Sequence, residues 1–170
     1  MHECKILTLN DARMVPEYIN LLYDAVGKIV HFYDKDILSQ ITGYYTPDSV
    51  IADIKSGNKR HIAHLSNNNL DGLLIEGFDT VGTRSFPLNR TLIRWVVAKY
   101  EGQGIGSRLV TNCVQRAVIE GKDVISLVVA RENSRAIRLY DHLGFVQDKK
   151  HAKSNDNMDL MHYTISTRIK

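Results

Sequence analysis

The chain has 170 residues, of which 44% are apolar and 24% charged; its net charge is +3 without a block of like charges, which argues against a dedicated nucleic-acid binder. No apolar run approaches the roughly 20 residues of a membrane-spanning helix, and the N-terminus lacks the apolar core of a secretory signal. We therefore expect a single cytoplasmic domain over residues 1–170, monomeric or homodimeric, without nucleic-acid or membrane partners.

The N-terminal third is predicted to contain one strand and two helices. Residues 5–8 have the composition of a strand, and residues 15–26 carry apolar side chains at helical spacing. An irregular stretch is expected from there to residue 45. Thr46-Pro47-Asp48 then predicts the start of a second helix, because proline suits the first helical position, and Gly57 ends that helix.

A β-hairpin is predicted next, with strands over residues 61–66 and 70–79 around the Asn67-Asn68-Asn69 turn. Glu76 follows an apolar run in the second strand. Its carboxylate either alternates toward solvent or is drawn toward the interior, where its pKa would be raised. A carboxylate of the second kind is suited to accept a proton, and both interpretations stay open on the sequence alone.

The histidines and cysteines predict no metal site. His61 and His64 are three apart on a predicted strand, so they face opposite sides of the sheet. His2 and Cys4 are too few to form a zinc site. Cys113 falls on the apolar stripe of a predicted helix, so we interpret it as a small buried hydrophobe and not as a nucleophile. Two cysteines make no disulfide framework and suit a reducing compartment.

The most informative stretch is Leu92–Arg108. Its first half is rich in β-branched and aromatic residues and predicts a buried strand, and Gly102, Gly104 and Gly106 then open a helix. Glycines let a ligand approach the backbone, and the first N–H groups of a helix have no internal partner. Such an end favours an anion, most naturally a phosphate. Alternatively, the glycines only form a tight turn and permit close helix packing.

The C-terminal part continues with alternating elements. Residues 124–130 predict a buried strand beside the first one, and a short helix over residues 134–142 is capped at Asn133 and ended by Gly144. A last strand around residues 158–164 is expected to close the sheet.

The order of strand, Gln-Gly-Ile-Gly turn, helix and strand, followed by Asn133–Tyr140 and Gly144-Phe145, resembles the GNAT family of acetyl-CoA-dependent N-acetyltransferases. The matching motifs cover about residues 92–146, and two motifs at the correct mutual distance are far more specific than a lone glycine triplet. The resemblance implies an α/β (α+β) fold. Its expected centre is a mixed, mostly antiparallel twisted sheet of six to seven strands, with about four helices on its two faces.

The resemblance also implies where acetyl-CoA binds. In the family, the strand backbone at Val96, Val97 and Ala98 splays from its neighbour and hydrogen-bonds the pantetheine arm. The turn N–H groups hold the diphosphate, which implies a role for Gln103, Gly104, Ile105, Gly106, Ser107 and Arg108. Asn133 is expected to contact the cofactor near its pantetheine end. Tyr140 is the expected general acid for the departing thiolate and is also expected to contact the cofactor. Alternatively, Tyr140 is a structural residue of the core.

Glu101 departs from the family pattern, which usually has Arg or Gln at this position. A carboxylate beside a diphosphate is repulsive, so we expect Glu101 to point to solvent or to weaken cofactor binding. Arg108, Lys99 and Arg131 are the cations available to offset its charge.

Acetyl transfer to an amine is a direct attack on a thioester carbonyl, which positioning, an oxyanion donor and proton removal accelerate. The amide of Val96 or Val97 is the expected oxyanion donor. Family members commonly use a Glu or Asp on a central strand as the base, so Glu76 is the candidate and Asp79 the reserve. The central strand itself carries Arg94 where other members carry an acid.

The expected function is acetyl transfer to a primary amine of a protein N-terminus, a lysine or a small molecule. The N-terminal helices and the loop at residues 80–90 would wall the acceptor pocket, but their sequence does not identify the acceptor. The C-terminal half also resembles ribosomal-protein N-terminal acetyltransferases, which favours protein α-amines slightly.

Two alternatives remain on the sequence. One is a non-catalytic acyl-CoA-binding sensor or interaction module. The other is a dinucleotide-binding oxidoreductase. Leu109 argues against it, because the glycine fingerprint of that class needs a third small residue at this position.

Overall fold

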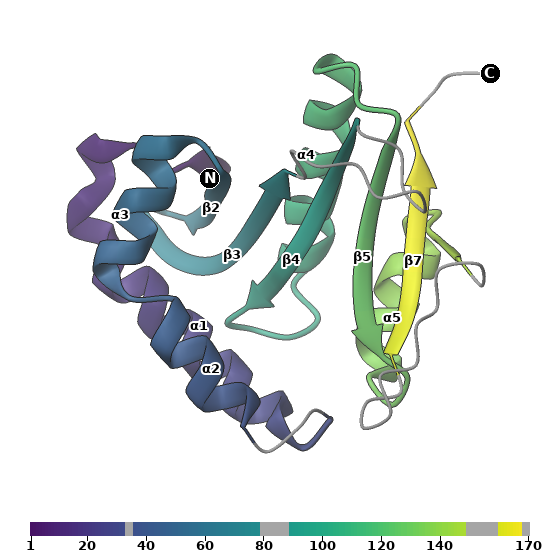
Figure 1. The fold of residues 1–170 in the computed structure, drawn as a ribbon, viewed down its shortest axis with the longest axis horizontal. Helices are drawn as coiled ribbons and strands as arrows, with labels where there is room; N and C mark the ends of the chain where they lie inside the picture. The colour runs from purple at the N-terminus through teal and green to yellow at the C-terminus, as the bar shows by residue number, and fades with distance from the viewer. Residues whose placement is uncertain (33–35, 79–88, 149–159, 168–170) are drawn as a thin grey trace.

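Seven strands form one twisted sheet in the computed structural model, which describes residues 1–32, 36–78, 89–148 and 160–167 (Figure 1). The strands are β1 (His2–Ile6), β2 (Lys59–Ser66), β3 (Asn69–Phe78), β4 (Arg90–Ala98), β5 (Val124–Ala130), β6 (Val146–Gln147) and β7 (Leu160–Ser166). Their order across the sheet is β1-β2-β3-β4-β5-β7-β6. All neighbours are antiparallel except β4 and β5, which are parallel. The predicted fold class, a mixed and mostly antiparallel sheet, is therefore confirmed.

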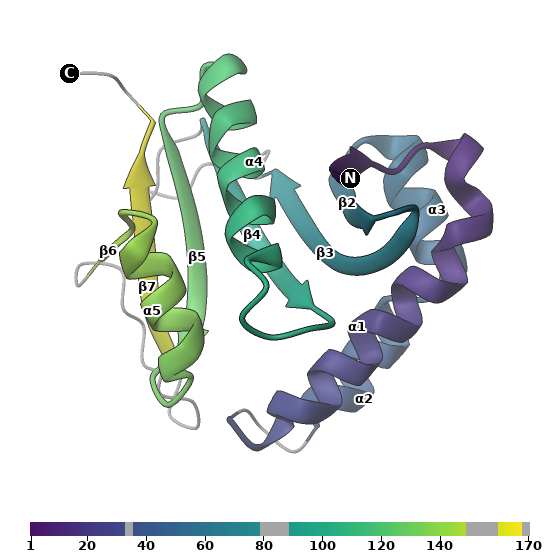
Figure 2. The same cartoon turned by 180° about the vertical axis from the view of Figure 1, so that it is seen from behind.

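Helices cover both faces of this sheet. They are α1 (Val15–Ile29), α2 (Ile37–Tyr44), α3 (Pro47–Ser56), α4 (Ile105–Ile119) and α5 (Ser134–His142), with 3₁₀ turns at Leu9–Met14 and Val30–Phe32. The first three helices pack on one face, and α4 and α5 lie on the other, as the view from behind shows (Figure 2). Within the described ranges, no helix has the length and apolarity needed to cross a bilayer.

Helix α2 is a helix that the sequence did not predict. It has only eight residues and contains the poor helix former Gly43 together with β-branched residues, so its local signal is weak. Its position is fixed by tertiary contacts, because Ile41 and the following Tyr45 are each only 5% exposed in the core beneath α1. The stretch expected to be irregular is therefore partly helical.

The sheet separates two hydrophobic clusters. The cluster on the α1 side contains Tyr18, Leu22 and Val26 of α1, packed against residues of β3 such as Leu73 and Ile75. The cluster on the α4 side joins α4 and α5 to the other face of the sheet, and its fully buried members include Ile62, Leu74, Ile105, Leu109, Val110 and Ile125. Burying a large aliphatic side chain contributes about 1.5–3 kcal/mol, so both clusters hold helices firmly on the sheet.

The predicted turns have the expected chemistry. Asn67 and Asn68 have φ angles of +50° and +66°, and asparagine tolerates this left-handed conformation in a two-residue hairpin turn. At the start of α3, the Thr46 hydroxyl accepts a hydrogen bond from the Ser49 amide at 3.2 Å. Gly57, with φ of +69°, ends α3. The hairpin and the second predicted helix are therefore confirmed.

Gly72 of β3 lets the first turn of α4 lie directly on the sheet. A Cβ added at Gly72 would lie 2.4 Å from Cγ2 of Ile105, and 3.1 Å from both Cδ1 of Leu109 and the carbonyl oxygen of Val97. The shortest of these distances is sterically forbidden. The height at which α4 begins above β3 and β4 therefore depends on a glycine at this position.

We predict that Gly72→Ala lowers the free energy of unfolding by about 1–3 kcal/mol, because the added methyl group overpacks the contact between β3 and α4. Urea unfolding measures the effect. The matched control is Gly27→Ala in α1, where an added Cβ meets nothing within 4 Å and should raise stability by up to about 1 kcal/mol. Equal stability of Gly72→Ala and the parent protein would contradict the prediction.

Candidate functional site

Strands β4 and β5 separate after a short paired segment. Their pairing runs only from Arg90 opposite Val124 to Ile93 opposite Leu127. Beyond this point β5 remains paired with β7, and β4 continues beside β3 as far as Ala98. Among the described residues, the second half of β4 thus has no strand partner on the side of β5. This is the splay that the family resemblance implied.

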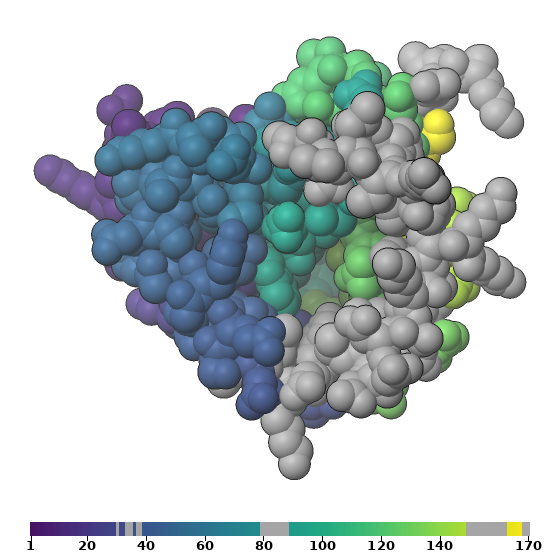
Figure 3. Space-filling model, in the orientation of Figure 1, coloured from purple at the N-terminus to yellow at the C-terminus, as the bar shows by residue number. Residues whose placement is uncertain are grey.

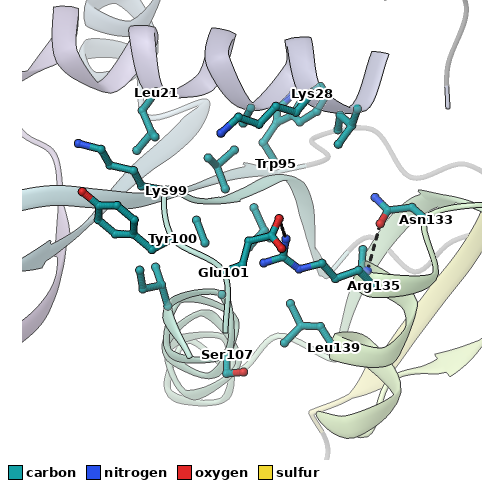
Figure 4. A pocket seen from close by; sticks show the side chains of 18 of the residues that line it. Leu21, Lys28, Trp95, Lys99, Tyr100, Glu101, Ser107, Asn133, Arg135 and Leu139 are labelled. Atoms are coloured by element: carbon teal, nitrogen blue, oxygen red, sulfur yellow. Dashed lines mark hydrogen bonds and ion pairs between the residues drawn. The ribbon is translucent and has the colours of Figure 1, made fainter. Parts of the chain in front are cut away.

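A cavity of about 740 Å³ extends along the open edge of β4, from α1 to the start of α4 and to α5 (Figure 4). This volume is in the range of small-molecule binding sites. Most of the predicted cofactor-binding residues line the cavity, namely Val96, Val97, Ala98, Gly104, Ile105, Gly106, Ser107, Asn133 and Tyr140. Helix α1, one of the N-terminal helices expected to wall the acceptor pocket, lines the cavity with Leu21, Asp24, Ala25, Val26, Lys28 and Ile29.

Helix α4 begins at the cavity without a side-chain cap. Its N-cap residue is Gly104, whose φ of +73° is in the left-handed region that favours glycine. The first hydrogen bond of the helix runs from the Arg108 amide to the Gly104 carbonyl at 3.0 Å. The preceding amides have no intrahelical acceptor, and the helix dipole adds partial positive charge at this end. The wall of the cavity at α4 therefore suits an anion.

Two other residues of the turn have packing roles. A Cβ added at Gly106 would lie 3.2 Å from Cδ2 of Leu139, so this glycine also permits the close approach of α4 to α5. Arg108 donates from Nη1 to the Gln103 carbonyl at 2.9 Å and braces the turn. Neither Gln103 nor Arg108 lines the cavity, so their predicted contact with a cofactor has less support than that of the other turn residues.

Asn133 and Tyr140 reach the cavity from α5. The Asn133 side chain caps this helix, with Oδ1 accepting from the Ala136 amide at 3.1 Å. Tyr140 is 7% exposed, and its ring lies 5.7 Å from that of Phe145 and 6.3 Å from that of Tyr163. Tyr140 is thus both a core residue and part of the cavity wall, so its two sequence interpretations are compatible.

Glu76 lies away from the cavity, on the face of β3 covered by α4. It is 1% exposed and accepts a hydrogen bond from Arg116 of α4, and Nη1 of Arg60 lies 3.5 Å from its other carboxylate oxygen. Arg60 also pairs with Glu120 at 2.7 Å. Burial and the adjacent Glu76 carboxylate raise the pKa of the Cys113 thiol. The structure therefore places Glu76 in a buried ion-pair cluster and does not bring it to the other predicted site residues.

Glu101 lies at the rim of the cavity, where it forms an ion pair with Arg135 of α5 (Figure 4). The side chains of Glu101 and Arg135 are 77% and 52% exposed, so Glu101 does point to solvent as expected. The cation beside it is not one of the three expected ones. Exposed ion pairs contribute only about 0–1 kcal/mol, so this pair can open at little cost.

His61 and His64 face opposite sides of the sheet, as predicted. Nε2 of His61 lies 3.2 Å from Oδ2 of Asp53 in α3, and burial lowers the pKa of this histidine. Nδ1 of His64 lies 2.5 Å from Oδ1 of Asp71 in β3, on the side of α4. The described part of the chain contains no group of three His, Cys, Asp or Glu residues arranged to hold a metal ion.

Comparison with known proteins agrees with this geometry. Residues 81–145 match the sequence model of the acetyltransferase (GNAT) family. The resemblance to the GNAT family is thus supported over these residues. This match leaves the dinucleotide-binding alternative without support.

Among solved structures similar to this chain is PaiA N-acetyltransferase from Thermoplasma acidophilum in complex with coenzyme A. The TM-score is 0.73 at 16% identity, over 95% of this chain and 98% of that one. YncA from Salmonella typhimurium with its cofactor acetyl-CoA has a TM-score of 0.70 at 18% identity, over 100% of this chain and 96% of that one. At such identities the likeness shows the fold.

Among curated proteins, the mycothiol acetyltransferase of Corynebacterium aurimucosum is 38% identical over 52 residues. The match covers 31% of this chain and 17% of that protein. The chain thus spans about a sixth of the length of this relative.

We predict that Glu76→Gln lowers the free energy of unfolding by about 3 kcal/mol, because it leaves the largely buried Arg116 guanidinium without its carboxylate. Urea unfolding measures the change. The control is Glu132→Gln, which removes a negative charge from an exposed side chain that does not line the cavity. If Glu76→Gln were as stable as this control, the ion pair would not hold α4 on the sheet.

Proposed function

We propose that the chain is an acetyl-CoA-dependent N-acetyltransferase that transfers an acetyl group to a primary amine of a small molecule, peptide or protein. The observation that carries this proposal is the open edge of β4 leading to the uncapped N-terminus of α4. An extended arm with amide groups can hydrogen-bond that edge in place of a neighbouring strand. A diphosphate matches the free amides of the helix.

In this proposal, acetyl-CoA supplies an activated acetyl group as a thioester. The backbone of Val96, Val97 and Ala98 holds its pantetheine arm, and an amide of Val96 or Val97 donates to the oxygen on which negative charge develops. The turn from Gly104 to Ser107 holds the diphosphate. These assignments are supported by the position of the same residues around one cavity.

Tyr140 is proposed as the acid that protonates the departing thiolate. It is buried at the cavity wall on α5, and its ring is held by Phe145 and Tyr163, so little orientational freedom remains to be lost in the reaction. Asn133, seven residues earlier, lies about two helical turns away at the start of the same helix.

Removal of a proton from the acceptor ammonium requires a group near the cavity. Glu76 does not line the cavity, and its charge is paired with Arg60 and Arg116. The reserve candidate Asp79 and the loop at residues 80–88 are not among the residues that the structure describes. The carboxylates that line the cavity in the described ranges are Glu101, which pairs with Arg135, and Asp24 of α1. Asp24 is therefore our candidate for attracting the acceptor ammonium.

The experiment that tests the proposed function is a thiol-release assay with acetyl-CoA and a panel of primary amines and peptides. Transfer releases one free thiol for each acetylated amine. Thermal stabilisation by acetyl-CoA, but not by NAD, is expected alongside, and reaches about 2.7 kcal/mol at a ligand concentration of 100 times Kd. Stabilisation without amine-dependent thiol release across the panel would favour a non-catalytic acyl-CoA sensor.

We predict that Tyr140→Phe lowers kcat by about 100-fold without changing the Kd for acetyl-CoA, because only the proton donor is lost. The matched control is Tyr163→Phe, which removes a hydroxyl from the same aromatic cluster but does not line the cavity. Unchanged turnover in Tyr140→Phe would remove this residue from the acid role.

We also predict that Glu101→Gln lowers the Kd for acetyl-CoA about threefold, because it removes a negative charge near the diphosphate and releases Arg135. Calorimetric titration at low and high salt measures the effect, which should shrink as salt screens the charges. Glu132→Gln is the charge-matched control. A higher Kd in Glu101→Gln would show that the ion pair itself helps to form the site.

A further inference from the structure

We propose that Arg94 binds an anionic oxygen group of the acceptor, so that the preferred substrates are small amines that carry a carboxylate or a phosphate. This inference rests on the proposed acetyltransferase function and names the substrate class of the same site.

Arg94 is the extra residue of a β-bulge in β4. Opposite it on β3, Ile75 pairs with Trp95 and Glu76 pairs with Ile93, so Arg94 has no cross-strand partner there. A bulge re-aims the side chain that it contains. Ile93 belongs to the cluster on the α4 side, and Trp95 packs with the cluster on the α1 side. In a regular strand these two side chains would lie on the same face, so the extra residue Arg94 shifts the inside–outside alternation of β4 by one position.

The Arg94 side chain lies on the α1 side of the sheet, over Gly77. A Cβ added at Gly77 would lie 2.4 Å from Nε of Arg94 and 3.2 Å from its Cζ, so the absence of a side chain at Gly77 provides the room for the guanidinium. On the same side, the positive charge of Arg94 acts on Tyr45 and opposes the rise of its pKa to about 12, which burial causes.

Arg94 does not itself line the cavity, but it is next in sequence to residues that do. It directly follows Ile93, the last residue of β4 that pairs with β5, and it directly precedes Trp95 and Val96 in the cavity wall. At about 3.3 Å per residue, Val96 is about 7 Å further along the strand. An amine attacking near Val96 would thus place an acidic group a few bonds away within reach of Arg94.

The charges around Arg94 leave it available for such a group. Its side chain is exposed, and it forms no ion pair with any residue of the described ranges. The carboxylate of Glu76, on the neighbouring strand β3, is on the opposite face of the sheet with Arg60 and Arg116. On the α1 side, the charged residues of the cavity wall are Asp24 and Lys28 of α1, with Lys99 at the end of β4.

A second polar group lies on this face at the point where the strands part. Ser126 of β5 is opposite Leu92 and is 2% exposed, and its hydroxyl has no hydrogen-bond partner among the described residues. Its neighbours Ile125 and Leu127 belong to the cluster on the α4 side, so Ser126 faces the other way, as Arg94 does. Figure 3 shows β4, in teal, in a depression beside α2 and α3 on this face.

The chemistry of these groups selects an anion. The planar guanidinium offers parallel N–H donors that match a carboxylate or phosphate, and such charge-assisted hydrogen bonds are among the strongest in proteins. With Asp24 attracting the ammonium, the face would recognise a molecule that carries both charges.

The test compares amines in pairs that differ only in the acidic group, using the thiol-release assay. The pairs are β-alanine with β-alaninamide, and phosphoethanolamine with ethanolamine, which separate a carboxylate from a phosphate. In the parent protein, kcat/KM for at least one acidic member should exceed that of its neutral partner by at least about tenfold. Arg94→Gln should abolish this preference by raising KM for the acidic member while leaving the neutral one unchanged.

Two further variants make the test specific. Gly77→Ala keeps the positive charge but displaces the guanidinium, so it should also weaken the preference. Arg138→Gln removes the same charge from an exposed position on α5 that does not line the cavity, and should leave the preference intact. All three variants should bind acetyl-CoA like the parent protein, since none alters its proposed contacts.

The outcomes separate this inference from the proposed function. Thiol release from neutral and acidic amines at equal kcat/KM, or a preference that survives Arg94→Gln, would overturn the role of Arg94 and leave acetyl transfer standing. If no amine in the panel releases thiol, calorimetric titration of β-alanine and phosphoethanolamine into the complex with coenzyme A replaces the assay. Weaker binding of either probe to Arg94→Gln would support the anion site, and equal or absent binding to both proteins would overturn it.

Discussion

The early end of the hydrogen bonding between β4 and β5 is the constraint on which the site depends. A strand in the middle of a sheet normally has its backbone paired on both sides, because unpaired buried N–H and C=O groups are costly. Here the pairing ends at Ile93 and Leu127. Packing of α4 on Gly72 and of Gly106 against Leu139 keeps helices on both sides of the opening. The cavity is thus a property of the sheet as much as of the side chains around it.

Much of this arrangement could be predicted from the sequence, because its signals are local. The asparagine turn, the Thr46-Pro47 helix start and the glycines before α4 each require a particular backbone conformation, and the structure has it at each place. The spacing from Asn133 to Tyr140 likewise fixes two residues on one short helix. The resemblance to the GNAT family and the walls of the cavity on β4, α4 and α5 follow from these segments.

The remainder depends on contacts between distant parts of the chain. The sequence left the burial of Glu76 open, because its partner Arg116 lies 40 residues away on another element. Glu101 and Arg135 meet only because the β4–α4 turn and α5 border the same cavity. Helix α2 has weak propensity and is held by tertiary packing. The bulge at Arg94 is invisible in the residue pattern, because only the register with β3 reveals the extra residue.

The four-residue overlap of β4 with β5 also divides the sheet mechanically. Strands β1 to β4 form one panel and β5, β7 and β6 form another, and the short overlap is their backbone connection. Beyond this overlap, the hydrophobic cluster under α4 and α5 joins the two panels, since it contains residues of β2, β3 and β4 as well as of β5 and β7. Cohesion of the two halves of the sheet is therefore carried largely by side-chain packing and not by backbone hydrogen bonds.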